Sequence, residues 1–162
     1  YFGVGKSTTI SILSGSLART SGDIYLANQE ISNSAALHQL VGVCPQFDII
    51  WEHLTVRQHL IFQAQQKGIP SHLIAGEVQR VACAVGLDGD GFVTSAGVLS
   101  GGMRRRLSIG MSIVGDPSII ILDEPTTGLD PDNRQHIWKI IHSLRHPKRL
   151  ILITTHSMEV PL

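Results

Sequence analysis

Two uninterrupted apolar runs limit the fold of this chain more than any other feature. Residues 118–122 read Ser-Ile-Ile-Ile-Leu, and residues 149–154 read Arg-Leu-Ile-Leu-Ile-Thr. Runs without alternating polar residues are typical of parallel strands that are buried on both faces of a sheet. Between the two runs, Asp130 and Pro131 provide a helix cap and a first helical position. Strand, helix and strand in this order predict a βαβ unit, and therefore an α/β fold.

Three polar residues follow these runs where each predicted strand ends. Asp123 and Glu124 come directly after the first run, and His156 lies just beyond the second. Because ligands collect at the carboxyl ends of parallel strands, Asp123 is placed to hold Mg²⁺, and Glu124 to polarise a water that attacks a γ-phosphate. His156 would emerge at the same edge, where it can hydrogen-bond that phosphate. The alternatives are a solvated acidic turn before the next helix and a structural histidine.

The first residues of the chain contain most of a phosphate-binding loop. Gly5-Lys6-Ser7 ends the pattern G-x-x-x-x-G-K-[ST] directly before a predicted helix, although the first glycine of the pattern would precede Tyr1. Gly3 and Gly5 leave room for phosphate against the backbone, and the N–H groups at the helix start face the anion. Lys6 would reach the β- and γ-phosphates, and the Ser7 hydroxyl would ligate Mg²⁺. The alternative is a glycine-rich turn before an ordinary helix.

The other segments predict a helical insertion in the α/β core. Spacing, turn residues and alternation predict a helix over 7–17, a turn at 20–23, a strand over 23–27, a helical turn over 37–40 and a strand over 41–44. They then predict a helix capped at Thr55, a second helix over 71–85, and a third from Ser100 to a break at 115–117. We therefore expect a core of residues 1–46 and 118–162 and a helical subdomain of residues 47–117.

The string Leu99-Ser100-Gly101-Gly102-Met103 opens the last of these helices. Taken alone, it reads as a helix cap and a flexible turn. Here it stands between Gln46 and the sequence Asp-Glu-Pro, with Gly-Leu-Asp-Pro and His156 further on. In this order the motifs resemble those of the ATP-binding cassette (ABC) ATPases, and the string is similar to their signature motif. The resemblance covers nearly the whole chain.

The resemblance implies a P-loop NTPase fold, with a RecA-like core and an inserted α-helical signature subdomain, that binds ATP and Mg²⁺. It assigns catalytic roles to Lys6, Glu124 and His156, and metal binding to Ser7, Gln46 and Asp123. Nucleotide contacts are implied for the Walker A loop (Gly3, Gly5, Lys6, Ser7 and Thr8), the Q-loop residue Gln46, the signature residues Ser100, Gly101 and Gly102, and the D-loop residue Asp130.

Members of this family pair two such domains head to tail, so that each ATP lies between one Walker A loop and the partner's signature motif. The resemblance therefore implies a second nucleotide-binding domain and transmembrane domains as partners, with this domain held at the cytoplasmic face of a membrane. Residues 42–46, 54–56 and 99–107 are similar to the A subfamily, whose characterised members mostly move lipids. We also expect further cassette strands before Tyr1 and a truncated C-terminal end. By itself, the polypeptide is predicted to fold poorly and to hydrolyse ATP weakly or not at all.

Two other segments bear on the partners of this domain. The apolar stretch Phe47 to Trp51 either receives a helix of a membrane domain in a groove or packs locally. The run Arg104-Arg105-Arg106 would support a soluble ABC ATPase that acts on ribosomes or DNA, but it is predicted to be a solvated helix face. A formal net charge of zero gives no electrostatic reason to expect nucleic-acid binding.

Overall fold

Among the residues that the structure describes, the central sheet has three parallel strands. The computed structural model describes residues 5–26, 29–30 and 34–155. In the sheet, the order is β3-β4-β5, with bounds β3 Val41–Cys44, β4 Ile119–Asp123 and β5 Leu150–Thr154. Helix α7 (Pro131–Ser143) connects β4 to β5, and Asp130 caps it by accepting a hydrogen bond from the Asn133 N–H at 3.1 Å. The predicted strands, their connecting helix and the α/β class are therefore confirmed. The predicted burial of β5 on both faces is wrong, because β5 is an edge strand of the described sheet, with Ile151 and Ile153 packed and Leu150 and Leu152 exposed.

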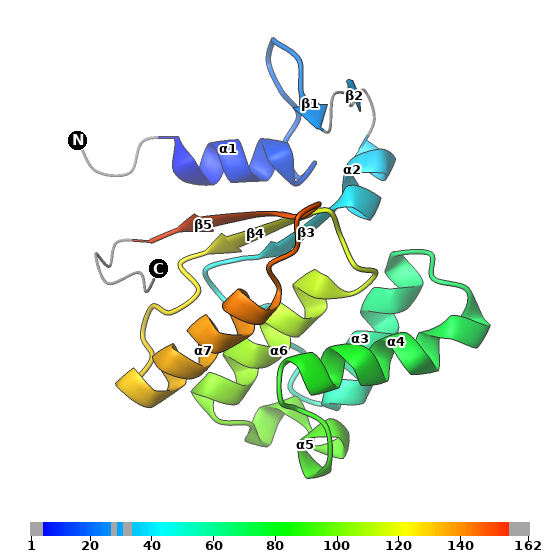
Figure 1. Ribbon diagram of the computed structural model, residues 1–162, viewed down its shortest axis with the longest axis vertical. Coiled ribbons are helices and arrows are strands. Elements are labelled where there is room, and N and C mark those ends of the chain that lie inside the picture. The colour runs from blue at the N-terminus through cyan, green and yellow to red at the C-terminus, as the bar shows by residue number, and fades with distance from the viewer. Residues whose placement is uncertain (1–4, 27–28, 31–33, 156–162) are drawn as a thin grey trace.

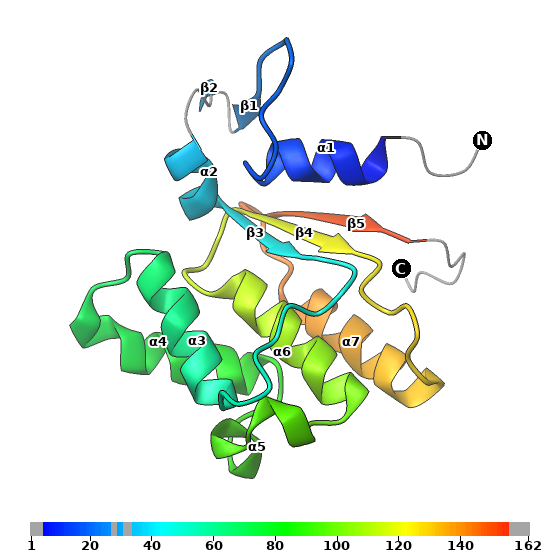
Figure 2. The same ribbon diagram turned by 180° about the vertical axis from the view of Figure 1, so that it is seen from behind.

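Helices cover both faces of this sheet (Figures 1 and 2). Helices α1 (Lys6–Leu13) and α2 (Ser34–Leu40) lie on one face, and α6 (Gly101–Ile113) and α7 lie on the other. Alternate residues of β4 pack on opposite faces of the sheet. Ile121 packs with Ile10 of α1 in a small apolar cluster, whereas Ile120 and Leu122 belong to the larger cluster. Burial on both sides explains why this strand is continuously apolar.

Most of the helices lie between β3 and β4 in the sequence. They are α3 (Val56–Gln66), α4 (Ser71–Ala84), α5 (Asp90–Val93), a short 3₁₀ helix (Ala96–Val98) and α6. α6 packs against β3 and β4 as well as against α3 and α4, so this helical segment shares one large hydrophobic cluster with the sheet. The division into a core and a subdomain at residues 47 and 117 stays a prediction. Among the described residues, no helix is both long enough and apolar enough to cross a bilayer.

Two boundary predictions near the N-terminus were wrong. The helix expected over 7–17 ends at Leu13, because Gly15 adopts a left-handed φ of 75° and turns the chain, so that Leu17 lies beyond the helix and is exposed. The strand expected over 23–27 is reduced to β1 (Tyr25–Leu26), which pairs antiparallel with β2 (Gln29–Glu30). Ala27 lies outside the described residues.

Candidate functional site

The carboxyl ends of the three strands form one edge of the sheet, which we call the rim. The register pairs Cys44 with Leu122 and Asp123 with Thr154, so the strand ends are level. Gln46 lies two residues beyond β3 and is exposed, and Asp123 is the last residue of β4. The amino end of α1 points toward the same end of the sheet in both views (Figures 1 and 2). The rim thus gathers the start of α1, the Gln46 loop and the acid pair.

The turn before α1 suits an anion. Gly5 is the N-cap of α1 with a φ of 104°, a left-handed conformation that favours glycine, and no side chain caps the helix. The first N–H groups of a helix lack intrahelical partners and attract negative charge. Lys6 and Ser7 begin the helix, and Thr8 in its first turn is exposed. Gly3 and the side chains of Lys6 and Ser7 lie outside the described residues.

Hydroxyl groups hold both carboxylates of the acid pair. Glu124 is 5% exposed and has a φ of 48°, which is rare for a residue with a side chain. Its N–H donates to the Thr154 carbonyl at 3.1 Å, and the Thr127 hydroxyl donates to its Oε2 at 3.0 Å. The Thr154 hydroxyl donates to Oδ1 of Asp123. Two neighbouring strand ends therefore fix the acid pair together, and His156 lies outside the described residues.

Arg105 of α6 is buried beneath this rim, contrary to the prediction of a solvated arginine face. Its exposed fraction is 4%, and its guanidinium donates to acceptors in the loop after β3 and in the loop after β4. The neighbouring arginines are also engaged by the protein. Arg104 donates to the Gly97 carbonyl at 2.9 Å, and Arg106 donates to the Gly86 carbonyl at 2.7 Å. Partial burial lowers the pKa of Arg106. The prediction failed because sequence spacing does not report how deeply a helix is embedded.

The signature string begins α6 and contacts the segment after β4. Ser100 is the N-cap, and its hydroxyl accepts the Met103 N–H at 3.2 Å. Gly101 is exposed, whereas Gly102 is buried against the side chain of Asn133 on α7. The Asn133 amide in turn donates to Asp130 at 2.5 Å. The signature and D-loop residues are therefore in one packed contact.

Within one copy of the chain, the signature and the phosphate loop are not brought together. α6 lies on the sheet face opposite to α1 in both views (Figures 1 and 2). Four of the predicted site residues that the structure describes therefore lie at the rim: Gly5, Gln46, Asp123 and Glu124. Ser100, Gly101, Gly102 and Asp130 form a second group on the α6–α7 side.

The apolar stretch after Gln46 divides into an exposed and a packed part. Phe47 is 79% exposed, and Ile49 is also exposed. Trp51 instead stacks on the His59 ring and meets Phe62 edge to face. Local packing therefore accounts for Trp51 but leaves Phe47 at the surface.

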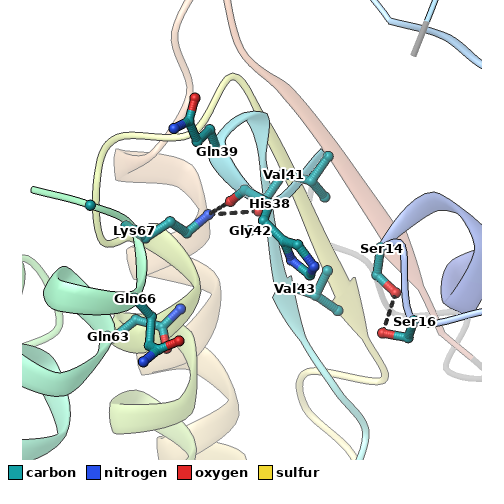
Figure 3. Close-up of a pocket in the computed structure, with 11 residues that line it drawn as sticks. Ser14, Ser16, His38, Gln39, Val41, Gly42, Val43, Gln63, Gln66 and Lys67 are labelled. Carbon is teal, nitrogen blue, oxygen red and sulfur yellow. Dashed lines mark hydrogen bonds between the residues drawn. The ribbon is translucent and has the colours of Figure 1, made fainter. Parts of the chain in front are cut away.

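One cavity lies away from the rim. It has a volume of about 500 Å³ and lies beside β3, between the ends of α1 and α3. Figure 3 shows Lys67 reaching from α3 toward β3, where its ammonium donates to the carbonyls of His38 and Val41. Burial lowers the pKa of Lys67. Since this cavity is at the amino end of β3, it does not belong to the acid pair.

Four residues of the site were not found from the sequence. They contact the acid pair or the signature string, and they are Arg105, Thr127, Thr154 and Asn133. Only Thr154 carried a usable signal, because it ends the predicted strand next to Asp123. Arg105 and Asn133 act through contacts between segments far apart in the chain, which no local pattern reveals.

The chain is similar to a known protein family and to several of its members. The family model described as ABC transporter matches residues 2–127. ABC transporter A family member 11 of Arabidopsis thaliana is 44% identical over 160 residues, which are 97% of this chain and 17% of that protein. The retinal-specific phospholipid-transporting ATPase ABCA4 of Homo sapiens is 41% identical over 162 residues, 97% of this chain and 7% of that protein. The chain thus spans less than a fifth of the length of these relatives.

A solved structure has the same fold. It is the ATP-binding cassette MJ0796, a dimer in a post-hydrolysis state bound to ADP and Pi, which superposes with a TM-score of 0.81 at 20% sequence identity. The superposition covers 95% of this chain and 71% of MJ0796. Together with the matched family model, these similarities show that the chain belongs to the ABC transporter family, as an ATP-binding domain homologous to those of A-family transporters.

Proposed function

We propose that this domain binds ATP with Mg²⁺ and hydrolyses it to drive transport across a membrane. The observation that carries the proposal is the position of Glu124, a buried carboxylate at the rim, beside Asp123 and near the Gln46 loop. A sheet edge with a phosphate loop on one side and two acids at its centre is what phosphoryl transfer to water requires.

The start of α1 would hold the phosphates. Its first N–H groups and the open turn at Gly5 suit the β- and γ-phosphates, and Lys6 would add a positive charge there. Any β-carbon at position 5 would need the left-handed φ that only glycine adopts easily. The role of Lys6 follows from the family motif.

Glu124 would act as the general base. The attacking water forms a bond to the γ-phosphorus while the bond to the bridging oxygen breaks, so that ADP leaves and the water's proton passes to the Glu124 carboxylate. Thr127 fixes Oε2 of that carboxylate from one side, and Thr154 fixes its backbone. His156 would hydrogen-bond the γ-phosphate from the end of β5.

The oxygen donors at the rim fit Mg²⁺. The Asp123 carboxylate is held in place by Thr154, and Gln46 is exposed at the next strand end, while Mg²⁺ prefers one or two carboxylates completed by water and phosphate oxygens. Ser7, Gln46 and Asp123 would hold the ion, directly or through water. When bound, Mg²⁺ neutralises charge on the phosphates.

A head-to-tail dimer would complete each site. Because α6 and α1 lie on opposite faces of one sheet, the Ser100 end of α6 cannot cover the same chain's phosphates. In a pair of cassettes, Ser100, Gly101 and Gly102 would donate to ATP held by the partner's phosphate loop, with Asp130 at the interface. MJ0796, which shares the fold, was solved as a dimer.

Coupling to transport would use the surface next to the Gln46 loop. Phe47 and Ile49 are exposed apolar side chains close to the rim, and they suit a short helix from a transmembrane domain. We propose a lipid substrate because ABCA4, a homologue at 41% identity, is a phospholipid-transporting ATPase. The domain would then sit at the cytoplasmic face of the membrane, with residues 47–117 as its helical subdomain.

A soluble ABC ATPase acting on ribosomes or DNA is the second candidate. The three consecutive arginines would be its support, but Arg104, Arg105 and Arg106 all donate to carbonyls of this domain. They are therefore poorly placed to neutralise nucleic-acid phosphates. No observation favours this candidate over transport.

Replacing Glu124 tests the proposal. In the full-length protein, Glu124→Gln should lower the rate of ATP hydrolysis by about 100-fold or more, while ATP binding is kept, because the base is lost but the phosphate contacts are not. Glu52→Gln is the matched control, since Glu52 is exposed and far from the acid pair in the sequence. Turnover that survives Glu124→Gln would contradict the role of Glu124, and a wild-type protein that binds no ATP would contradict the proposed function itself.

A further inference from the structure

Arg105 joins three parts of the molecule that are distant in the sequence. From α6, its Nε donates to the Pro125 carbonyl at 2.9 Å, and its Nη2 donates to the carbonyls of Asp123 at 2.8 Å and Glu124 at 3.1 Å. The three acceptors belong to residues 123–125, where β4 ends and the following loop begins. Two nitrogens of the guanidinium, Nε and Nη2, thus hold the backbone that carries the acid pair.

The remaining nitrogen of the same guanidinium, Nη1, donates hydrogen bonds to the Gln46 loop. Nη1 donates to the Pro45 carbonyl at 2.7 Å, to the Gln46 carbonyl at 3.3 Å and to Asp48 Oδ1 at 2.9 Å. Asp48 is the charged partner, while the other acceptors are backbone carbonyls. Each of these carbonyls would otherwise lose its hydrogen bond on burial, which is costly for a polar group.

Only an arginine can make this set of contacts. Its planar fork presents five N–H donors in fixed directions, whereas a lysine ammonium presents three around one atom. The acceptors of Arg105 lie in two loops on either side of the fork. A lysine of similar length could reach one loop but not span both.

The backbone that Arg105 holds is the part of the rim that most needs support. Glu124 adopts a φ of 48°, a left-handed conformation that a residue with a β-carbon leaves easily. Its N–H is tied to Thr154 and its carbonyl to Arg105. Rotation of this peptide would move the Glu124 carboxylate from the position in which the Thr127 hydroxyl holds it.

We infer that Arg105 is a positioning residue that holds the Glu124 carboxylate and the Gln46 loop in register with the signature helix. Ser100 caps helix α6, on which Arg105 lies, so a shift of the signature end is carried through the guanidinium to both loops. The inference rests on the proposed ATP hydrolysis at the rim. The hydrogen bonds of Arg105 described above all go to protein groups, so Arg105 would act through the groups it holds.

The neighbouring residue Arg106 provides a matched control for the experiment. Arg105→Gln and Arg105→Lys are compared in the full-length protein with Arg106→Gln, which removes a half-buried arginine from the same helix. Arg106 donates to the Val85 and Gly86 carbonyls at the end of α4, away from the rim. For each variant, kcat, KM, the Kd for ATP and the thermal midpoint are measured.

A positioning role has a distinct signature. We expect Arg105→Gln and Arg105→Lys to lower kcat by about 10- to 100-fold, since small displacements of reacting groups have effects of this size. The Kd for ATP should change by less than about threefold, because the phosphate contacts stay intact. Arg106→Gln should lower the thermal midpoint while leaving kcat unchanged.

The outcomes separate this inference from the proposed function. If Arg105→Lys keeps the wild-type kcat, or if Arg106→Gln lowers kcat as much as Arg105→Gln does, Arg105 has only a structural role. Should the Arg105 variants fail to fold, Asp48→Asn takes their place, because it removes the charged partner alone, and an unchanged kcat would then overturn the inference. In all these cases, loss of turnover in Glu124→Gln would still support ATP hydrolysis at the rim.

Discussion

Gly102 of the signature string has no room for a side chain because Asn133 of α7 lies against it. A β-carbon added to Gly102 would stand 2.1 Å from Oδ1 of Asn133, far inside contact distance. The same Asn133 side chain donates to Asp130, and its backbone N–H is capped by that aspartate. The start of the signature helix and the start of α7 therefore share one amide group, which transmits a displacement of either helix to the other.

Gly102→Ala should consequently destabilise the domain, by about 1–3 kcal/mol, since the new methyl group must displace the Asn133 amide. Gly101→Ala is the control, because a β-carbon at Gly101 meets nothing within 4 Å. Thermal unfolding would measure both. A double variant, Gly102→Ala with Asn133→Ala, should recover part of the loss. Equal midpoints for Gly101→Ala and Gly102→Ala would show that Asn133 can move aside at no cost.

A second glycine marks the closest approach between the sheet and α6. A β-carbon on Gly42 would lie 1.8 Å from the Ser112 carbonyl oxygen, so Gly42→Ala should separate β3 from α6 and cost more than about 2 kcal/mol. Gly76→Ala is the matched substitution inside α4, where a β-carbon meets nothing within 4 Å. It should stabilise the helix by about 0.5–1 kcal/mol. Thermal midpoints that move in the same direction for both variants would contradict this account.

The sequence predicted the parts of the fold whose cause is local. β4 was found because a strand buried on both faces must be apolar throughout, and the acid pair was placed at the rim because it directly follows β4. β5 was found from the same pattern, although Leu150 and Leu152 on one of its faces are exposed. β1 was predicted from its alternation but over too long a range, and β2 was missed, since a two-residue strand is too short to alternate. Gly15 ended α1 earlier than the apolar spacing indicated.

The supporting residues could not be predicted for a different reason. The contacts of Arg105 reach residues 45–48 and 123–125, which are about 60 positions before it and 20 positions after it in the sequence. Asn133 likewise meets Gly102 only because α6 and α7 pack side by side on one face of the sheet. Such partners depend on the tertiary arrangement, and a run of three arginines reads the same whether it faces solvent or a loop.

The amino end of α3 is fixed by a reciprocal pair of hydrogen bonds. The Gln58 N–H donates to the Thr55 hydroxyl at 3.2 Å, and the Thr55 N–H donates to Gln58 Oε1 at 2.8 Å. Thr55→Ala removes one of these bonds and should cost about 0.5–2 kcal/mol, whereas Thr55→Ser keeps the hydroxyl and should cost much less. Thermal unfolding of the two variants is the measurement. If serine and alanine lower the midpoint equally, the packing of the threonine methyl group matters more than the cap.

The stability of the domain should fall in mild acid because His59 is held neutral. The Trp51 N–H donates to Nε2 of His59 at 3.0 Å, and Nδ1 lies 2.8 Å from the Thr55 carbonyl, so Nδ1 carries the proton and Nε2 must stay free of one. Burial lowers the pKa of His59, opposed by its hydrogen bond to Thr55 and aided by nearby His53. Between the unfolded pKa of about 6.5 and the lower folded value, the unfolded chain therefore binds more protons than the folded one. The stabilisation is present above about pH 6.5 and is lost as the pH falls through the folded pKa.

His59→Gln removes this titration, so the difference in free energy of unfolding between wild type and variant should shrink as the pH falls from about 7.5 to 5.5. Burial lowers the pKa of His136 as well, but His136 is present in both proteins and its contribution cancels in the difference. Chemical denaturation at a series of pH values gives the two curves. Parallel curves would mean that His59 accepts a proton in the folded state without losing Trp51. Because Trp51 packs on His59 at the end of the stretch that begins with exposed Phe47, curves that converge would also predict that acid loosens the surface next to the Gln46 loop before the sheet unfolds.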